Sequence, residues 1–223
     1  MYGQGETKPM LVERAMGKLV RDRSGVSFLE FALILPVLLT LGLFGAEVAY
    51  MSVVDMQVSM IATSVADNAS RLGQTDNSSV TPTVTEREIA SVMTGALTEG
   101  GSIDLVDHGR IILSSLEYDA DSDRQYISWQ RCSGNFDRAS DYGGEGYGRS
   151  GPRLQNMGEN GHTVTASSGT AVMFVEVFYE YQPLFGAMYS SGTTFHHEAA
   201  YIIRDDRNLE PGVTGGNSTT SCD

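Results

Sequence analysis

Apolar residues cluster near the start of the chain and then thin into a regular stripe. Residues 31–46 carry no charge and are almost entirely apolar. Beyond them, apolar residues recur every three or four positions, the period of one helical face. We therefore predict one long helix over residues 27 to about 72, with its first half in a membrane and its second half packed on a folded head. The predicted stripe comprises Val48, Met51, Val54, Val58, Ile61, Val65, Ala69 and Leu72.

The pattern changes after residue 72. Residues 73–83 are polar and predict a linker. Thr85 and Glu88 have the spacing of a capping box, which marks the start of a short amphipathic helix that ends at Gly100 and Gly101. This helix is expected to cover one face of a sheet with Ile89, Val92, Met93, Ala96 and Leu97.

Alternating apolar and polar residues in the second half of the chain predict strands. Residues 110–118 and 125–131 flank an acidic turn and predict a hairpin, and residues 171–181 and 195–204 predict two further strands. Trp129 is expected in the core. The glycine-rich residues 141–161 predict a mobile surface loop, and residues 208–223 a loose tail. The fold class is therefore α+β, with a head over residues 73–207 in which a small antiparallel sheet packs on the long helix.

Charge is distributed unevenly along the 223 residues. The formal net charge is −13, and residues 1–25 contribute +2, which leaves −13 − 2 = −15 for the rest. Such an acidic body argues against a nucleic-acid partner or an anionic membrane surface, since both attract basic patches. Basic residues precede the apolar run, and Glu47 and Asp55 follow it. This asymmetry predicts a cytoplasmic N-terminus with the remainder outside.

The chain has two cysteines, Cys132 and Cys222. In an oxidising compartment they are expected to form one disulfide that ties the C-terminus to the middle of the head. The alternative is two free thiols, one of them on the tail.

Three interpretations compete for residues 1–50. A secretory signal peptide needs small residues at its cleavage site, but Phe44 precedes Ala46 and Glu47 precedes Ala49 at the critical position. A plain membrane anchor needs about 20 apolar residues, which the run reaches only by extending across Glu30 or Glu47. The third interpretation accounts for a glycine and an acid together.

The stretch Gly25-Val26-Ser27-Phe28-Leu29-Glu30-Phe31 resembles the processing site of type IV prepilins. The resemblance implies that a membrane aspartic peptidase cuts after Gly25, which makes Val26 the new N-terminus and Glu30 the fifth residue of the mature chain. A carboxylate inside an apolar helix bundle is costly when unpaired, so Glu30 is expected to neutralise the α-amino group of a neighbouring subunit. Pro36, within the apolar half, is expected to kink or loosen the helix.

The longer string RDRSGVSFLEFALILPVLLTLGLFGAEVAY is similar to the TadE family of the tight adherence (Flp) pilus system. These proteins are pseudopilins, or minor pilins, with a larger head than the major pilin. The later strings VMFVEVFYEYQPLF, FHHEAAYIIRDDR and WQRCSG also resemble that family. The resemblance touches about half of the chain and leaves residues 72–110 and 138–165 without a matching motif.

The resemblance implies a domain order and a set of partners. Residues 1–25 would be a cytoplasmic leader, residues 26–72 a helix whose N-terminal half crosses the bacterial inner membrane, residues 73–207 a periplasmic head, and residues 208–223 the tail. The implied partners are a prepilin peptidase, a sister pseudopilin, the major Flp-type pilin, the assembly platform and inner-membrane lipid. The implied function is structural, in pilus assembly, adhesion and biofilm formation, with surface exposure within the pilus.

A rival hypothesis is an uncleaved single-pass protein whose periplasmic head binds or senses a ligand. An enzyme is not expected, because no converging catalytic set is evident, and no cofactor or metal is predicted. Adjacent His196 and His197 should point to opposite faces of a strand and have structural roles. The acidic residues 119–123 lack the glycine and the glutamate of a calcium loop and predict a solvated turn. Tyr142 and Tyr147 are candidate contacts, and Glu47 is expected at headgroup level or paired within a filament.

Overall fold

The computed structural model describes residues 17, 24–73, 81–159, 161–186, 192–204, 206–210, 212–215 and 222. Most of the predicted leader, residues 74–80 of the predicted linker and much of the predicted tail lie outside these residues. By its internal contacts the chain divides into two units, Met1–Ala46 and Glu47–Asp223. They are called here the N-terminal unit and the C-terminal unit.

One helix, α2 (Ser24–Ser70), runs through the end of the first unit into the second, close to the predicted span. Its residues from Gly25 to Ala46 are all exposed, and Glu47 is the first buried one. Proline does not interrupt it, since the helix continues through Pro36.

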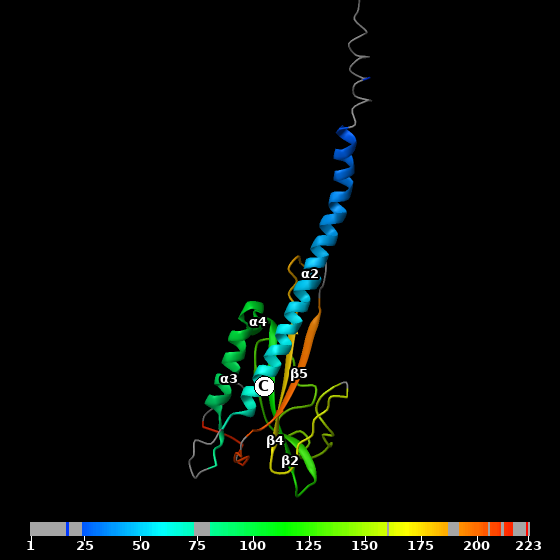
Figure 1. Cartoon of the computed structure of the whole chain (residues 1–223). Coiled ribbons are helices and arrows are strands. Elements are labelled where there is room, and N and C mark those ends of the chain that lie inside the picture. Colours follow the sequence, from blue (N-terminus) through cyan, green and yellow to red (C-terminus); the bar gives the residue numbers. More distant parts are fainter. Residues whose placement is uncertain are drawn as a thin grey trace, which may run out of the picture. The chain divides into compact units, whose positions relative to one another are not determined.

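The C-terminal unit is built on a four-stranded antiparallel sheet (Figure 1). Its strands are β2 (Gly109–Asp119), β3 (Arg124–Ser133), β4 (Ala171–Glu180) and β5 (Thr194–Ile202). They lie in the order β3-β2-β4-β5, and each neighbouring pair is antiparallel. The predicted hairpin and the two later strands are thus confirmed, and the α+β class with them.

The second half of α2 and the helix α3 (Glu86–Glu99) pack on one face of this sheet and form the main core. Trp129 is part of it, as expected, with 4% of its surface exposed. The predicted stripe is confirmed in the middle of α2 and wrong at its start, because Val48 is 46% exposed. The fully buried core residues of α2 are Val54, Val58, Ile61, Ala62, Val65, Ala66 and Ala69.

The predicted capping box begins α3. The Thr85 hydroxyl accepts the Glu88 amide at 3.3 Å, and a Glu88 carboxylate oxygen accepts the Thr85 amide at 2.8 Å. Ile89, Met93 and Ala96 are buried, which confirms the expected face. After Glu99 the chain tightens into a short 3-10 helix, η1 (Gly100–Ile103), followed by α4 (Leu105–His108).

A β-bulge in β3 redirects its side chains. Trp129 pairs with Ser115 and Ile127 pairs with Leu116, so one extra residue of β3 lies between the two pairs. Trp129 therefore packs in the main core, whereas Ile127 packs in a second cluster on the opposite face. Plain alternation would have placed both on the same face.

The glycine-rich segment covers that opposite face. The Gly146 amide donates to the Ile127 carbonyl at 2.7 Å, and the Ile127 amide donates to the Tyr147 carbonyl at 3.0 Å. Leu154 and Met157 are buried in the second cluster. Backbone hydrogen bonds at Gly146 and Tyr147 and the burial of Leu154 and Met157 thus attach this segment to the sheet at these points.

The C-terminal residues also return to the unit. β6 (Val213–Thr214) pairs in parallel with β1 (Val84–Thr85), so the expectation of a loose tail is wrong at these residues. Cys132 and Cys222 form the predicted disulfide, with a sequence separation of 90 residues.

Candidate functional site

The predicted processing and assembly residues all lie in the N-terminal unit. Gly25, Val26, Glu30, Phe31 and Pro36 belong to the first four turns of α2. The structure places all five residues on one continuous helix, and all five are exposed.

Large apolar side chains dominate this part of α2, and they are exposed. Val26 is 63% exposed, Phe28 75% and Phe31 59%. The helix is long and apolar enough to cross a membrane, and no residue of its most apolar window is buried. Soluble monomers rarely expose such a continuous apolar surface.

Gly25 lies in the first turn of α2, so its backbone is helical in this structure. A Cβ atom added there would meet no other atom within 4 Å. The fold therefore gives no steric reason for a glycine at this position. Glycine also weakens a helix and eases its local unwinding.

Glu30 is exposed on the apolar helix. It forms no hydrogen bond or ion pair with any residue that the structure describes. Pro36 leaves the Ala32 carbonyl without its usual amide donor. The Thr40 hydroxyl donates to the Pro36 carbonyl at 2.8 Å one turn later.

Glu47 has partners within the chain that the sequence did not indicate. It is 2% exposed and accepts three hydrogen bonds within the C-terminal unit. The Tyr181 hydroxyl donates at 2.7 Å, and the amides of Leu184 and Phe185 donate at 3.3 and 3.2 Å. Burial and the bond to Glu47 raise the pKa of Tyr181 above its usual value. Glu47 thus anchors the loop after β4.

The two adjacent histidines lie on opposite faces of β5, as predicted. His197 faces α2, where its Nε2 lies 2.7 Å from Asp55 Oδ1. His196 stacks on the Phe178 ring on the other face, with 4.1 Å between centroids. The acidic turn is closed by its own side chains, because Asp119 accepts hydrogen bonds from the Asp121 amide and the Ser122 hydroxyl.

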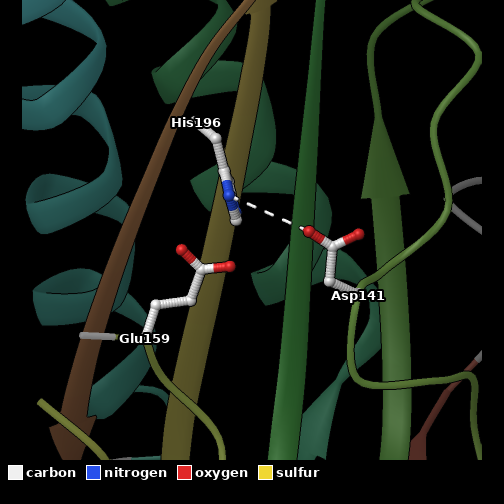
Figure 2. A group of neighbouring side chains, drawn as sticks. All are labelled: Asp141, Glu159 and His196. Atoms are coloured by element: carbon white, nitrogen blue, oxygen red, sulfur yellow. Dashed lines mark ion pairs between the residues drawn. The ribbon is translucent and has the colours of Figure 1, made fainter. Parts of the chain in front are cut away.

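His196 lies among carboxylates that the sequence did not connect (Figure 2). Two overlapping groups have possible metal-ligand atoms within 4.8 Å of one another. One comprises Asp141, Glu159 and His196, and the other Glu176, His196 and Glu198. Tyr142, one of the candidate contacts, donates its hydroxyl to Glu198 at 2.6 Å. Burial first, and then this hydrogen bond, raise the pKa of Tyr142 above its usual value. Tyr147 remains 39% exposed.

Comparison of the chain with protein-family models, with curated proteins and with solved structures found no match.

Proposed function

We propose that the chain is a minor pilin or pseudopilin of a tight adherence pilus, of the TadE-like kind. In this proposal a prepilin peptidase cuts after Gly25, and the mature chain enters a pilus or its assembly complex through α2. The protein acts structurally, in pilus assembly, adhesion and biofilm formation. Its partners are a sister pseudopilin, the major Flp-type pilin and the assembly platform.

The observation that carries the proposal is the spacing of Gly25 and Glu30 at the start of an exposed apolar helix. Neither residue is explained by the fold of the chain itself. Gly25 has open space around it, and Glu30 has no partner among the described residues. This is expected if Gly25 is recognised by a peptidase and Glu30 contacts a neighbouring subunit.

The physical role of Glu30 follows from its surroundings. A carboxylate in the middle of a membrane costs on the order of 2.5–3.5 kcal/mol, and an opposite charge in the same apolar environment offsets that cost. Cleavage after Gly25 creates such a charge, the α-amino group of Val26. When α2 helices of neighbouring subunits pack together, Glu30 of one subunit pairs with that amine on the next.

The proposed topology is a single pass through the bacterial inner membrane. The basic residues of the leader stay in the cytoplasm, and the acidic C-terminal unit lies in the periplasm or on the surface within the pilus. An oxidising periplasm also suits the disulfide between Cys132 and Cys222.

The decisive experiment is N-terminal mapping of the protein from cells with and without the membrane peptidase. We expect Val26 as the first residue only when the peptidase is present. The variant Gly25→Ala should abolish cleavage while leaving the fold intact, since the added Cβ meets nothing. Gly42→Ala is the matched control, because that helix position is equally open and lies away from the cleavage site.

A leader that stays attached in every molecule would favour the rival hypothesis, an uncleaved single-pass protein with a ligand-binding or sensing head. That hypothesis also requires Glu30→Ala to leave function unchanged. Normal cleavage of Gly25→Ala would remove the specific support for a prepilin peptidase.

A further inference from the structure

A polar cluster that ranges from the buried Glu176 to the exposed Asp141 and Glu159 lies on the face of the sheet opposite to the helices. Glu176 on β4 and Glu198 on β5 are direct cross-strand partners in the register of the sheet. His196 lies two residues before Glu198 on β5, so its side chain points to the same face. Asp141 and Glu159 approach the histidine ring from the covering loops (Figure 2).

The charges of this cluster are poorly balanced. Glu176 is completely buried, and like charges directly opposite on neighbouring strands repel. Among the described residues, no lysine or arginine forms an ion pair with Glu176 or Glu198. Arg138, the nearby cation, pairs with Asp141 Oδ1 at 2.9 Å and lies over the Phe178 ring.

The imidazole of His196 has an unused nitrogen inside this cluster. Its Nε2 is buried without a hydrogen-bond partner and lies 3.8 Å from Glu198 Oε1. Its Nδ1 lies 3.9 Å from Asp141 Oδ2. The stack on Phe178 fixes the plane of the ring. A buried nitrogen that neither donates nor accepts is costly, and a ligand that fills the space beside it removes the cost.

The two glutamates are held in place by donors behind them. Both oxygens of Glu176 accept one hydrogen bond each, from the Asp141 amide at 2.9 Å and the Ser140 hydroxyl at 2.5 Å. An ionised carboxylate oxygen has two lone pairs, so each oxygen keeps one for a further partner. Such outer hydrogen bonds orient metal-binding carboxylates in proteins.

Glu198 is held in the same way. The Tyr142 hydroxyl donates to its Oε1 at 2.6 Å, and the Glu159 amide donates to its Oε2 at 3.1 Å. Both donors belong to the loops that cover this face of the sheet. The covering loops therefore fix the geometry of the cluster.

We propose that Glu176, His196 and Glu198 form a binding site for a divalent transition-metal ion of the zinc type. His196 Nε2 and one oxygen from each glutamate are the protein ligands. Asp141 Oδ2 lies 3.9 Å from Nδ1 and orients the ring once it closes to hydrogen-bond distance. One imidazole with carboxylates suits zinc, whereas calcium takes six to eight oxygens. Ligand atoms around a tetrahedral zinc ion lie about 3.3 Å apart. The 3.8 Å between His196 Nε2 and Glu198 Oε1 therefore needs a contraction of about 0.5 Å, and the other pairs, which all lie within 4.8 Å, need one of at most about 1.5 Å. This site is independent of the proposed pilus function.

The test uses the full chain, purified in detergent and stripped with EDTA. Titration with Zn²⁺ alone should give one ion per chain and raise the thermal unfolding midpoint, which the single tryptophan reports. His196→Asn should weaken binding by about 100-fold or more, and Asp141→Asn by about tenfold. His197→Asn is the matched control, because the adjacent ring faces α2 and bonds to Asp55. It should bind zinc as the unmodified chain does.

Three results would overturn the proposal. The first is that the unmodified chain shows no saturable zinc binding. The second is that His196→Asn binds zinc as tightly as the unmodified chain, and the third is that His197→Asn loses as much zinc affinity as His196→Asn. If a variant does not fold, X-ray absorption at the zinc edge of the unmodified protein still tests the proposal. A bound zinc ion that has no imidazole among its ligands would exclude the site. Normal cleavage after Gly25 with any of these results would leave the proposed pilus function standing.

Discussion

Glu30 and Glu47 lie on the same helix, yet they have opposite surroundings. Glu30 is exposed among apolar side chains and has no partner among the described residues, whereas Glu47 is 2% exposed and accepts three hydrogen bonds. The boundary between the two units falls at Glu47. Before it α2 has an apolar surface without an internal core, and from it onward α2 is part of one.

This contrast separates a residue that serves the fold from one that, in the proposed function, serves another molecule. In the C-terminal unit, the buried Glu47 finds its donors within the chain. In the N-terminal unit, Glu30 has no partner among the described residues. Substitutions should therefore change stability in the C-terminal unit, and processing or assembly in the N-terminal unit.

The largest expected effect on stability comes from the disulfide. Replacing Cys132 and Cys222 together with serine opens a loop of 90 residues between them. In the chain-entropy model this lowers the free energy of unfolding by about 4–5 kcal/mol. Urea unfolding of the full chain in detergent, followed by the fluorescence of buried Trp129, measures the loss. A loss below about 1 kcal/mol would show that the C-terminal unit does not depend on this link.

Glu47→Ala should have the next largest effect. It leaves the Tyr181 hydroxyl and the amides of Leu184 and Phe185 without their buried acceptor, which costs about 3 kcal/mol. The same urea experiment measures it. Glu30→Ala is the matched control, since it makes the same change on the same helix. Equal effects of the two substitutions would contradict the proposed division.

Thr85→Ala should have a smaller effect within the C-terminal unit. It removes the hydroxyl that accepts the Glu88 amide at the start of α3, and loss of such a cap costs about 1 kcal/mol. A shift of the urea midpoint with an unchanged slope would verify it. Thr94→Ala is a suitable control, because its hydroxyl only bonds back to the Ala90 carbonyl in the exposed middle of the helix.

Glu30→Ala should have the smallest effect on stability, within about 0.5 kcal/mol, because the residue has no partner to lose among the described residues. Its effect on assembly should nevertheless be complete, since the amine of Val26 on a neighbouring subunit then has no counter-charge. Counting assembled pili on cells that express the variant tests this. Normal pili would remove the assembly role of Glu30, and a large loss of stability would reveal an internal role for it.

Local sequence patterns were sufficient for most of the secondary structure. The capping box at Thr85, the hairpin around residues 119–123 and the alternation in β4 each depend on neighbours in sequence, and all three were predicted. The bulge between Trp129 and Ile127 was not, because one extra residue in a strand leaves no mark on a simple alternating pattern. The covering of the second sheet face was missed for a related reason, since glycines alone do not tell a mobile loop from a fixed one.

The candidate sites also differ in whether neighbours in sequence or distant contacts define them. Gly25 and Glu30 were found from sequence because their spacing along one helix is itself the signal. The role of Glu47 was missed, since its partners at Tyr181, Leu184 and Phe185 are far away along the chain. The cluster at His196 was missed because it depends on the pairing of β4 with β5 and on two loops.

The sequence by itself determined the long apolar helix, the glycine and acid at its start, the α+β class and the pairing of its two cysteines. Short-range periodicity, charge asymmetry and a cysteine pair carry that information without any fold. The tertiary structure alone decided which acids are buried, with Glu47 and Glu176 inside and Glu30 outside. Burial of a carboxylate depends on what packs over it from distant parts of the chain, and no local pattern specifies that.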